Sequence, residues 1–136
     1  MDTPISRTED ERLWAALAHG SIVFMGILGP LIIYLVKKEE APWVGRQAIQ
    51  SLLYHVAVGL GLSVVIFASI TLTVVTAIGG AVISPESALA GVGFGWMCCW
   101  PLYLLAAVVY GFYGAYECYQ GRNFKYKFIG NLVTGL

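Results

Sequence analysis

Charged side chains are nearly absent from the middle of this chain. From Gln47 to Tyr116 the sequence contains only one, Glu86. Each ionised group at the centre of a bilayer costs roughly 2.5–3.5 kcal/mol, whereas a water-soluble core does not require so long an uncharged run. We therefore predict an integral membrane protein. The polar stretches are too short to hold a soluble catalytic domain, so we also predict that the protein is not an enzyme.

The sequence also has no excess of basic residues, and its cysteines are not paired. Eight Lys and Arg balance eight Asp and Glu, so there is no electrostatic case for nucleic acid binding. The three cysteines, Cys98, Cys99 and Cys118, contain no Cys-x-x-Cys pair. We interpret them as small apolar core residues. The sequence thus indicates neither a metal site nor a disulfide framework.

Three long apolar segments make up most of the chain. They span about residues 13–36, 49–83 and 89–119, and a tail at 120–136 carries basic and apolar residues that predict an amphipathic stretch. Because unpaired strand edges cannot face lipid, we predict an all-α integral membrane helical bundle. The length of 136 residues and the mean hydropathy of +0.74 are typical of a single membrane domain, residues 1–136.

The first apolar segment contains residues that break helices, namely Gly26, Gly29 and Pro30. Pro30 cannot donate the helical hydrogen bond to residue 26, and Gly26 has no side chain to clash with its ring. We therefore predict a kink or hinge at Gly26–Pro30. A buried hinge would also let the segment enter the membrane and return to the same face.

The distribution of Lys and Arg sets the expected orientation. The loop Lys37–Arg46, which we interpret as an interfacial turn, and the tail both carry them, whereas the loop around Glu86 has none. We therefore predict a multi-pass protein of the inner (plasma) membrane, with the Lys37–Arg46 loop and the tail in the cytoplasm. Three simple crossings would put the N-terminus outside, and a re-entrant first segment would put it inside. Both alternatives stay open.

Two histidines, His19 and His55, lie in different apolar segments. Histidines from two helices can ligate a haem or chlorin, but neither of these belongs to a recognisable ligand motif. The simpler interpretation is that each one hydrogen-bonds to a neighbouring helix or backbone carbonyl. We therefore expect no cofactor, and we keep haem or chlorin binding by His19 or His55 as an alternative.

Small residues recur every four positions in the second and third apolar segments. Such rows let helix backbones approach closely, either within the chain or against a partner. The predicted packing residues are Ala107, Gly111 and Ala115, then Ala57 and Gly61, and then Gly59 and Ser63. The expected partners are the lipid bilayer and other membrane subunits or further copies of this chain.

Several stretches resemble a known family. They are Arg12–His19, Gly29–Glu39, Pro42–Val44, Gln47–Gln50 and Tyr119–Arg122. In this order they resemble small bacterial and archaeal membrane proteins of a domain-of-unknown-function family related to the Tic-twenty-like superfamily. Plant members of that superfamily belong to the chloroplast inner-envelope translocon. No catalytic residues are established for the family, so the resemblance implies none here.

These observations lead to one functional prediction and two alternatives. We predict a structural or accessory membrane protein that packs in a larger membrane complex or a homo-oligomer without catalysis. The first alternative is a channel or protein-translocation component, as the resemblance implies. The second is a haem- or chlorin-binding subunit that uses an intramembrane histidine.

Overall fold

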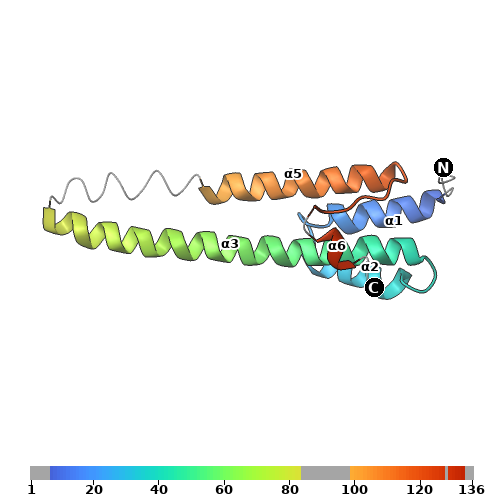
Figure 1. The fold of residues 1–136 in the computed structure, drawn as a ribbon, viewed down its shortest axis with the longest axis horizontal. Coiled ribbons are helices and arrows are strands. Elements are labelled where there is room, and N and C mark those ends of the chain that lie inside the picture. The colour runs from blue at the N-terminus through green and yellow to red at the C-terminus, as the bar shows by residue number, and fades with distance from the viewer. Residues whose placement is uncertain (1–6, 84–98, 128, 134–136) are drawn as a thin grey trace. The chain divides into compact units, whose positions relative to one another are not determined.

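The computed structural model describes residues 7–83, 99–127 and 129–133. Within these ranges every regular element is a helix, which confirms the all-α prediction for them (Figure 1). The helices are α1 (Glu9–Gly20), α2 (Leu28–Lys37), α3 (Pro42–Ile83), α5 (Cys99–Tyr119) and α6 (Gly130–Val133). The predicted loop around Glu86 and the expected start of the third segment lie outside the described residues.

The chain divides into two compact units. The first contains the residues up to Ala57 and those from Val108 onward, and the second contains Val58–Ala107. The long helices α3 and α5 contribute to both units, whereas α1, α2 and α6 belong to the first. That the two units form one membrane domain stays a prediction.

The predicted hinge is a reversal of the chain. The turn Ser21–Ile27 separates α1 from α2, and the Ser21 carbonyl accepts backbone N–H groups from three residues of this turn. Gly26 has a φ of 49°, which side chains rarely adopt. Gly29 and Pro30 lie in the first turn of α2, where a helix leaves its N–H groups unbonded and therefore tolerates proline. The first apolar segment is thus broken just ahead of Pro30.

The two helices on either side of this turn run antiparallel. Lys37 Nζ, at the end of α2, lies 3.9 Å from a carboxylate oxygen of Asp10 and 5.4 Å from the ring centre of Trp14, both in α1. With 12 and 10 residues, neither helix reaches the length of about 20 residues that crosses a bilayer. The predicted break in residues 13–36 is therefore confirmed, and the alternative in which this segment makes a third simple crossing is not supported. The described residues contain two candidate spans, Pro42–Thr76 and Cys99–Tyr119.

The helix α3 begins earlier than expected. Pro42 occupies its first position, where the missing N–H would have no helical partner. Trp43 is therefore already helical and only 4% exposed, so the prediction of an interfacial turn extending to Arg46 is wrong for its second half. The turn is confined to the residues between Lys37 and Pro42. The first turns of α3 pack inside the first unit.

In the second unit, α3 carries large apolar side chains that face outward. Leu60, Val64 and Phe67 are 65%, 68% and 74% exposed. On α5, Leu102 and Leu105 are exposed in the same way. A continuous apolar exterior along helices of this length is unfavourable in water and suits a hydrocarbon environment.

Candidate functional site

His19 is fully buried and uses both ring nitrogens. Its Nδ1 lies 2.8 Å from the Tyr126 hydroxyl, and its Nε2 lies 3.2 Å from Gln47 Oε1. An amide oxygen only accepts, so Nε2 carries the proton and Nδ1 accepts the Tyr126 O–H. The neutral ring therefore joins α1 to α3 and to the tail that follows α5.

Gln47 extends this network to α5. Its Nε2 donates to the Phe124 carbonyl at 3.2 Å, and its Oε1 also accepts from Cys118 Sγ at 3.3 Å. The Phe124 carbonyl fixes the orientation of the amide, because only the nitrogen end can donate to it. The donors and acceptors therefore match throughout, and such a satisfied buried network rigidifies the packing around it.

Aromatic rings surround the network. Tyr126 stacks on Tyr54, with ring centres 4.1 Å apart, and meets the rings of Phe124 and Tyr110 edge-on. Phe124 also lies edge-on to His19, with ring centres 5.6 Å apart. Such aromatic pairs add stability beyond the area that they bury. The tail is therefore held in place by its two inward-facing rings.

Burial keeps the centre of the network neutral. α1 lies outside the two candidate spans, and burial lowers the pKa of His19 to about 4, opposed in part by the hydrogen bond to Gln47. Burial likewise raises the pKa of Tyr126. The neutral His19 ring is thus hydrogen-bonded on both sides and joins α1 to α3 and the tail.

The second histidine anchors the turn between α1 and α2. His55 Nδ1 lies 2.8 Å from the Gly26 carbonyl and therefore donates to it. Its Nε2 is buried and has no partner among the described residues. The described residues contain no group of three or more His, Cys, Asp or Glu side chains that could hold a metal ion. Of the two histidines, only His55 keeps a free lone pair.

A second junction lies at the start of α3. Trp43 Nε1 donates to Asn123 Oδ1 at 2.8 Å, and the Arg7 guanidinium lies 4.0 Å from the centre of the Trp43 ring. Arg7 Nε also donates to the Gly121 carbonyl at 3.0 Å. The N-terminal arm, the first turn of α3 and the tail therefore meet at one place.

A comparison with protein families shows which family the chain belongs to. Residues 10–133 match the model of the magnetosome magnetite crystal formation protein family (MamF/MmsF). The chain belongs to this family. The matched residues run from α1 to α6 and include every member of the His19 network. No curated protein and no solved structure matches the chain.

The resemblance to the Tic-twenty-like superfamily is therefore wrong, since the matched family is the magnetosome one. Of the stretches that suggested it, Gly29–Glu39 covers most of α2 and Pro42–Val44 is the start of α3. Glycine and proline at a helix start, and tryptophan near a membrane interface, recur in unrelated membrane proteins for local physical reasons. The protein-translocation role loses its basis with the resemblance. A membrane protein with an accessory part in crystal formation agrees with the family assignment.

The predicted packing row on α5 faces α1 in this family member. A Cβ added to Gly111 would lie 3.4 Å from Ile22 Cγ2 and 3.6 Å from the His19 carbonyl oxygen. Ala115 Cβ lies 4.0 Å from the position that a Cβ on Gly20 would take. Ala107 is buried as well. At Gly111 and Ala115 the row lets α5 approach α1 within the same chain.

The predicted packing residues on α3 divide into two groups. A Cβ on Gly61 would overlap the Tyr103 hydroxyl, which donates to the Val58 carbonyl at 3.0 Å. Three others are exposed: Ala57, Gly59 and Ser63. Ser63 Oγ bonds back to the Gly59 carbonyl at 3.0 Å, as helical serines commonly do. Packing of this exposed group against a partner stays a prediction.

Sequence reasoning missed most of the His19 network. Gln47, Cys118 and Tyr126 were not singled out as its members, although Cys118 was expected in the core and is buried. One signal was present: Phe124 and Tyr126 alternate with Lys125 and Lys127, a period of two that marks an extended segment with one face buried. Of the other cysteines, Cys99 is exposed, and Cys98 lies outside the described residues.

Proposed function

We propose that this chain is an accessory protein of the magnetosome membrane that influences magnetite crystal formation through the membrane assembly it builds, without catalysis. The observation that carries the proposal is the contrast between the two kinds of surface. The His19 ring and the Gln47 amide that it meets have hydrogen-bond partners within the chain, whereas apolar side chains on α3 face outward. Family membership supplies the biological setting.

The proposed topology has two crossings, made by α3 and α5. The hairpin of α1 and α2 enters from one face and returns to it, which the contact between Lys37 and Asp10 supports. The bond from Arg7 to the Gly121 carbonyl puts the N-terminal arm beside the tail. Together these contacts favour the re-entrant alternative, with all Lys and Arg residues on the cytoplasmic side.

The proposed assembly uses the second unit. Gly59 and Ser63 lie four positions apart on α3 and are exposed, and such rows of small residues let a second helix approach closely. Ala57, at the end of the first unit, is exposed as well. Further copies of this chain or another membrane subunit would pack there. Native mass measured in mild detergent distinguishes a homo-oligomer from a complex with another protein.

The function is tested by deleting the gene in a magnetite-forming bacterium and restoring it as variants. We expect the deletion strain to form crystals of altered size or shape, measured by electron microscopy. The His19→Leu variant removes the centre of the buried network and should behave like the deletion. Glu9→Gln, a matched control on the exposed face of the same helix, should restore normal crystals. Unchanged crystals in the deletion strain would refute the proposal.

Cofactor binding is kept as a second candidate because of His55 alone. His19 could ligate iron only after losing its bond to Tyr126 or Gln47, whereas His55 Nε2 is buried without a partner among the described residues. A haem or chlorin in the purified protein would give strong visible absorbance that His55→Ala abolishes. A spectrum without visible bands would exclude this candidate.

A further inference from the structure

The tip of the hairpin formed by α1 and α2 exposes large apolar side chains. Phe24, in the turn, is 84% exposed. The other exposed apolar residues around it are Val23, Met25, Ile27 and Leu28. No charged residue occurs between Arg12 and Lys37, so the charges of the hairpin lie towards its open end. The hairpin therefore has a charged base and an apolar tip.

Backbone carbonyls at this tip are bonded by side chains of α3. Ser51 Oγ donates to the Ala18 carbonyl at 2.8 Å, and His55 Nδ1 donates to the Gly26 carbonyl at 2.8 Å. Ser21 Oγ adds a second donor to the Ala18 carbonyl, also at 2.8 Å. Water would supply such donors at an aqueous surface, whereas hydrocarbon requires them from the protein. These bonds suit a tip that is surrounded by acyl chains.

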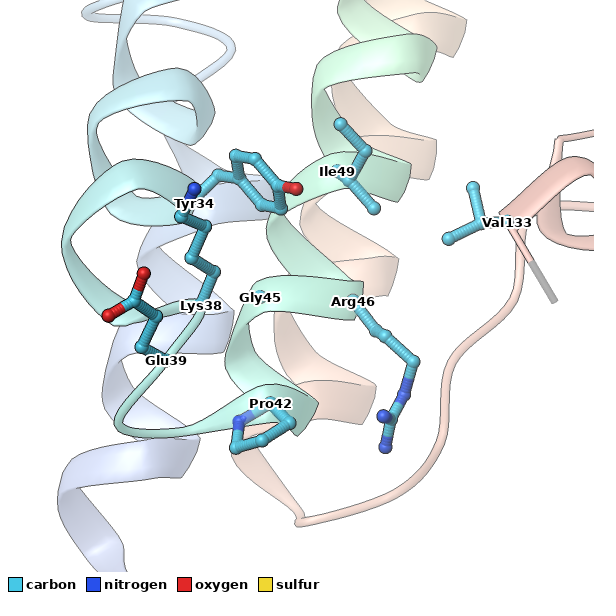
Figure 2. Close-up of a pocket in the computed structure, with 8 residues that line it drawn as sticks. All are labelled: Tyr34, Lys38, Glu39, Pro42, Gly45, Arg46, Ile49 and Val133. Atoms are coloured by element: carbon cyan, nitrogen blue, oxygen red, sulfur yellow. The ribbon is translucent and has the colours of Figure 1, made fainter. Parts of the chain in front are cut away.

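The hairpin follows α3 for about the thickness of one lipid leaflet. At the base, Gly45 of α3 lies beside Lys38 of α2, and a Cβ on Gly45 would lie 2.9 Å from Lys38 Cα (Figure 2). At the tip, His55 of α3 bonds to the Gly26 carbonyl. These two positions of α3 are ten residues apart. Ten helical residues rise about 15 Å, which is half of a hydrocarbon core of about 30 Å.

Both candidate spans continue beyond the level of the tip. The span on α3 extends past His55 to Thr76, and α5 begins at Cys99, well before the position of Gly111 next to Ile22. The volume of the hairpin is therefore confined to one leaflet. Material inserted into a single leaflet enlarges the area of that leaflet alone, and a bilayer relieves the difference by bending, with the enlarged leaflet on the convex side.

We infer that the hairpin of α1 and α2 is a wedge that inserts into one leaflet and draws the protein to strongly curved membrane, with the hairpin on the convex side. The acyl chains of that leaflet cover the tip. The exposed apolar surface favours lipid over a protein partner, because it is spread over α1, the turn, α2 and α5 around a groove of about 490 Å³ rather than confined to one helix face. The inference rests on the proposed membrane placement of α3 and α5.

The test measures how the full-length chain distributes between a giant vesicle of dioleoyl phosphatidylcholine and a thin membrane tube pulled from it. Glu9→Cys, at the exposed base of the hairpin, is introduced after the native cysteines are replaced by alanine. A membrane-impermeant fluorescent maleimide added outside then marks only molecules whose hairpin faces the convex side of the tube. We expect the labelled chain to be about two- to threefold denser per membrane area in the tube than in the vesicle.

A polar tip should weaken this enrichment. Phe24→Ser combined with Met25→Ser draws the tip towards the headgroups, so the wedge becomes shallower and the enrichment should fall at least by about half. Val64→Ser combined with Phe67→Ser is the matched control, because it removes two exposed apolar side chains from α3 outside the hairpin and should leave the enrichment unchanged. Both double variants should keep the wild-type helical content by circular dichroism, since all four side chains are exposed.

A spin label at Phe24→Cys measures the surroundings of the tip directly. We expect it to collide with dissolved oxygen, which concentrates in hydrocarbon, and not with a water-soluble nickel chelate. Collision with the chelate would place the tip in water and overturn the inference. Protection from both reagents would show that a protein covers the tip, either a partner or a second copy of this chain. Equal losses of enrichment in the two double variants would also contradict the wedge.

The wedge and the proposed function can fail independently. Retention of the chain in membranes after an alkaline carbonate wash tests the membrane placement without reference to curvature. Equal density in the tube and the vesicle for a chain that resists this wash would overturn the wedge alone. Crystal size in the deletion strain separately tests the role in magnetite formation.

Discussion

His19 and Gln47 meet between α1 and α3, with His19 Nε2 donating to Gln47 Oε1 at 3.2 Å. Gln47 simultaneously bonds to the Phe124 carbonyl and to Cys118. Through this pair, the hairpin at the start of the chain, the first turns of α3, the end of α5 and the tail become one folded unit.

Tyr126→Phe should destabilise the protein by about 1–3 kcal/mol. The change removes only the hydroxyl and leaves His19 Nδ1 as a buried acceptor without a partner. Thermal unfolding in detergent, followed by circular dichroism, measures the effect. Tyr119→Phe removes the same group from a residue that is 50% exposed and should be nearly neutral. Equal melting temperatures for the two variants would contradict the assigned bond.

Stability should fall as the pH drops from about 6.5 towards 4. The folded His19 has a pKa of about 4, below its ordinary value of 6.5, so the unfolded chain takes up the proton first and acid favours unfolding. The free energy of unfolding is therefore highest above pH 6.5, and it falls by up to about 3 kcal/mol as the pH drops through this window. Comparing the pH dependence of the melting temperature with that of His19→Phe checks this. The melting temperature of His19→Phe should depend less steeply on pH than that of the wild type. An unchanged dependence would mean that other groups cause it.

Gly61→Ala should be less stable than Gly59→Ala by about 1 kcal/mol. Both changes improve helix propensity equally. The new methyl group at position 61 would displace the Tyr103 hydroxyl from the Val58 carbonyl, whereas position 59 faces open space. Chemical or thermal unfolding of the two variants in the same detergent provides the comparison. If Gly61→Ala is as stable as Gly59→Ala, the hydrogen bond from Tyr103 to the Val58 carbonyl does not require glycine at position 61.

Labelling with a membrane-impermeant maleimide should place both ends of the chain on one side. Single cysteines at Glu9, Lys125 and Ser87 are introduced after Cys98, Cys99 and Cys118 are replaced by alanine. We expect Glu9→Cys and Lys125→Cys to react only in inverted membrane vesicles, and Ser87→Cys only in right-side-out vesicles. Position 87 lies outside the described residues and serves here as a reporter for the loop. If Glu9→Cys and Ser87→Cys react in the same kind of vesicle, the result would support the topology with three crossings instead.

Much of the local structure was predictable because it depends on nearby residues. The lack of charge between Gln47 and Tyr116 indicated the membrane class, and Gly26, Gly29 and Pro30 marked the break in the first segment. Backbone freedom at glycine and the missing N–H of proline act wherever these residues occur. Short motifs were less informative, since apolar helices of unrelated membrane proteins share them, and they led to the wrong family.

The sequence by itself determined that this chain is helical, apolar over most of its length and broken ahead of Pro30. Only the tertiary structure decided that residues 13–36 return on themselves and that His19, Gln47 and Tyr126 share one network. Periodicity describes one segment at a time and does not specify which distant segment covers its polar groups. A buried histidine must find donors and acceptors somewhere, and here the fold supplies them from residues 28 and 107 positions away.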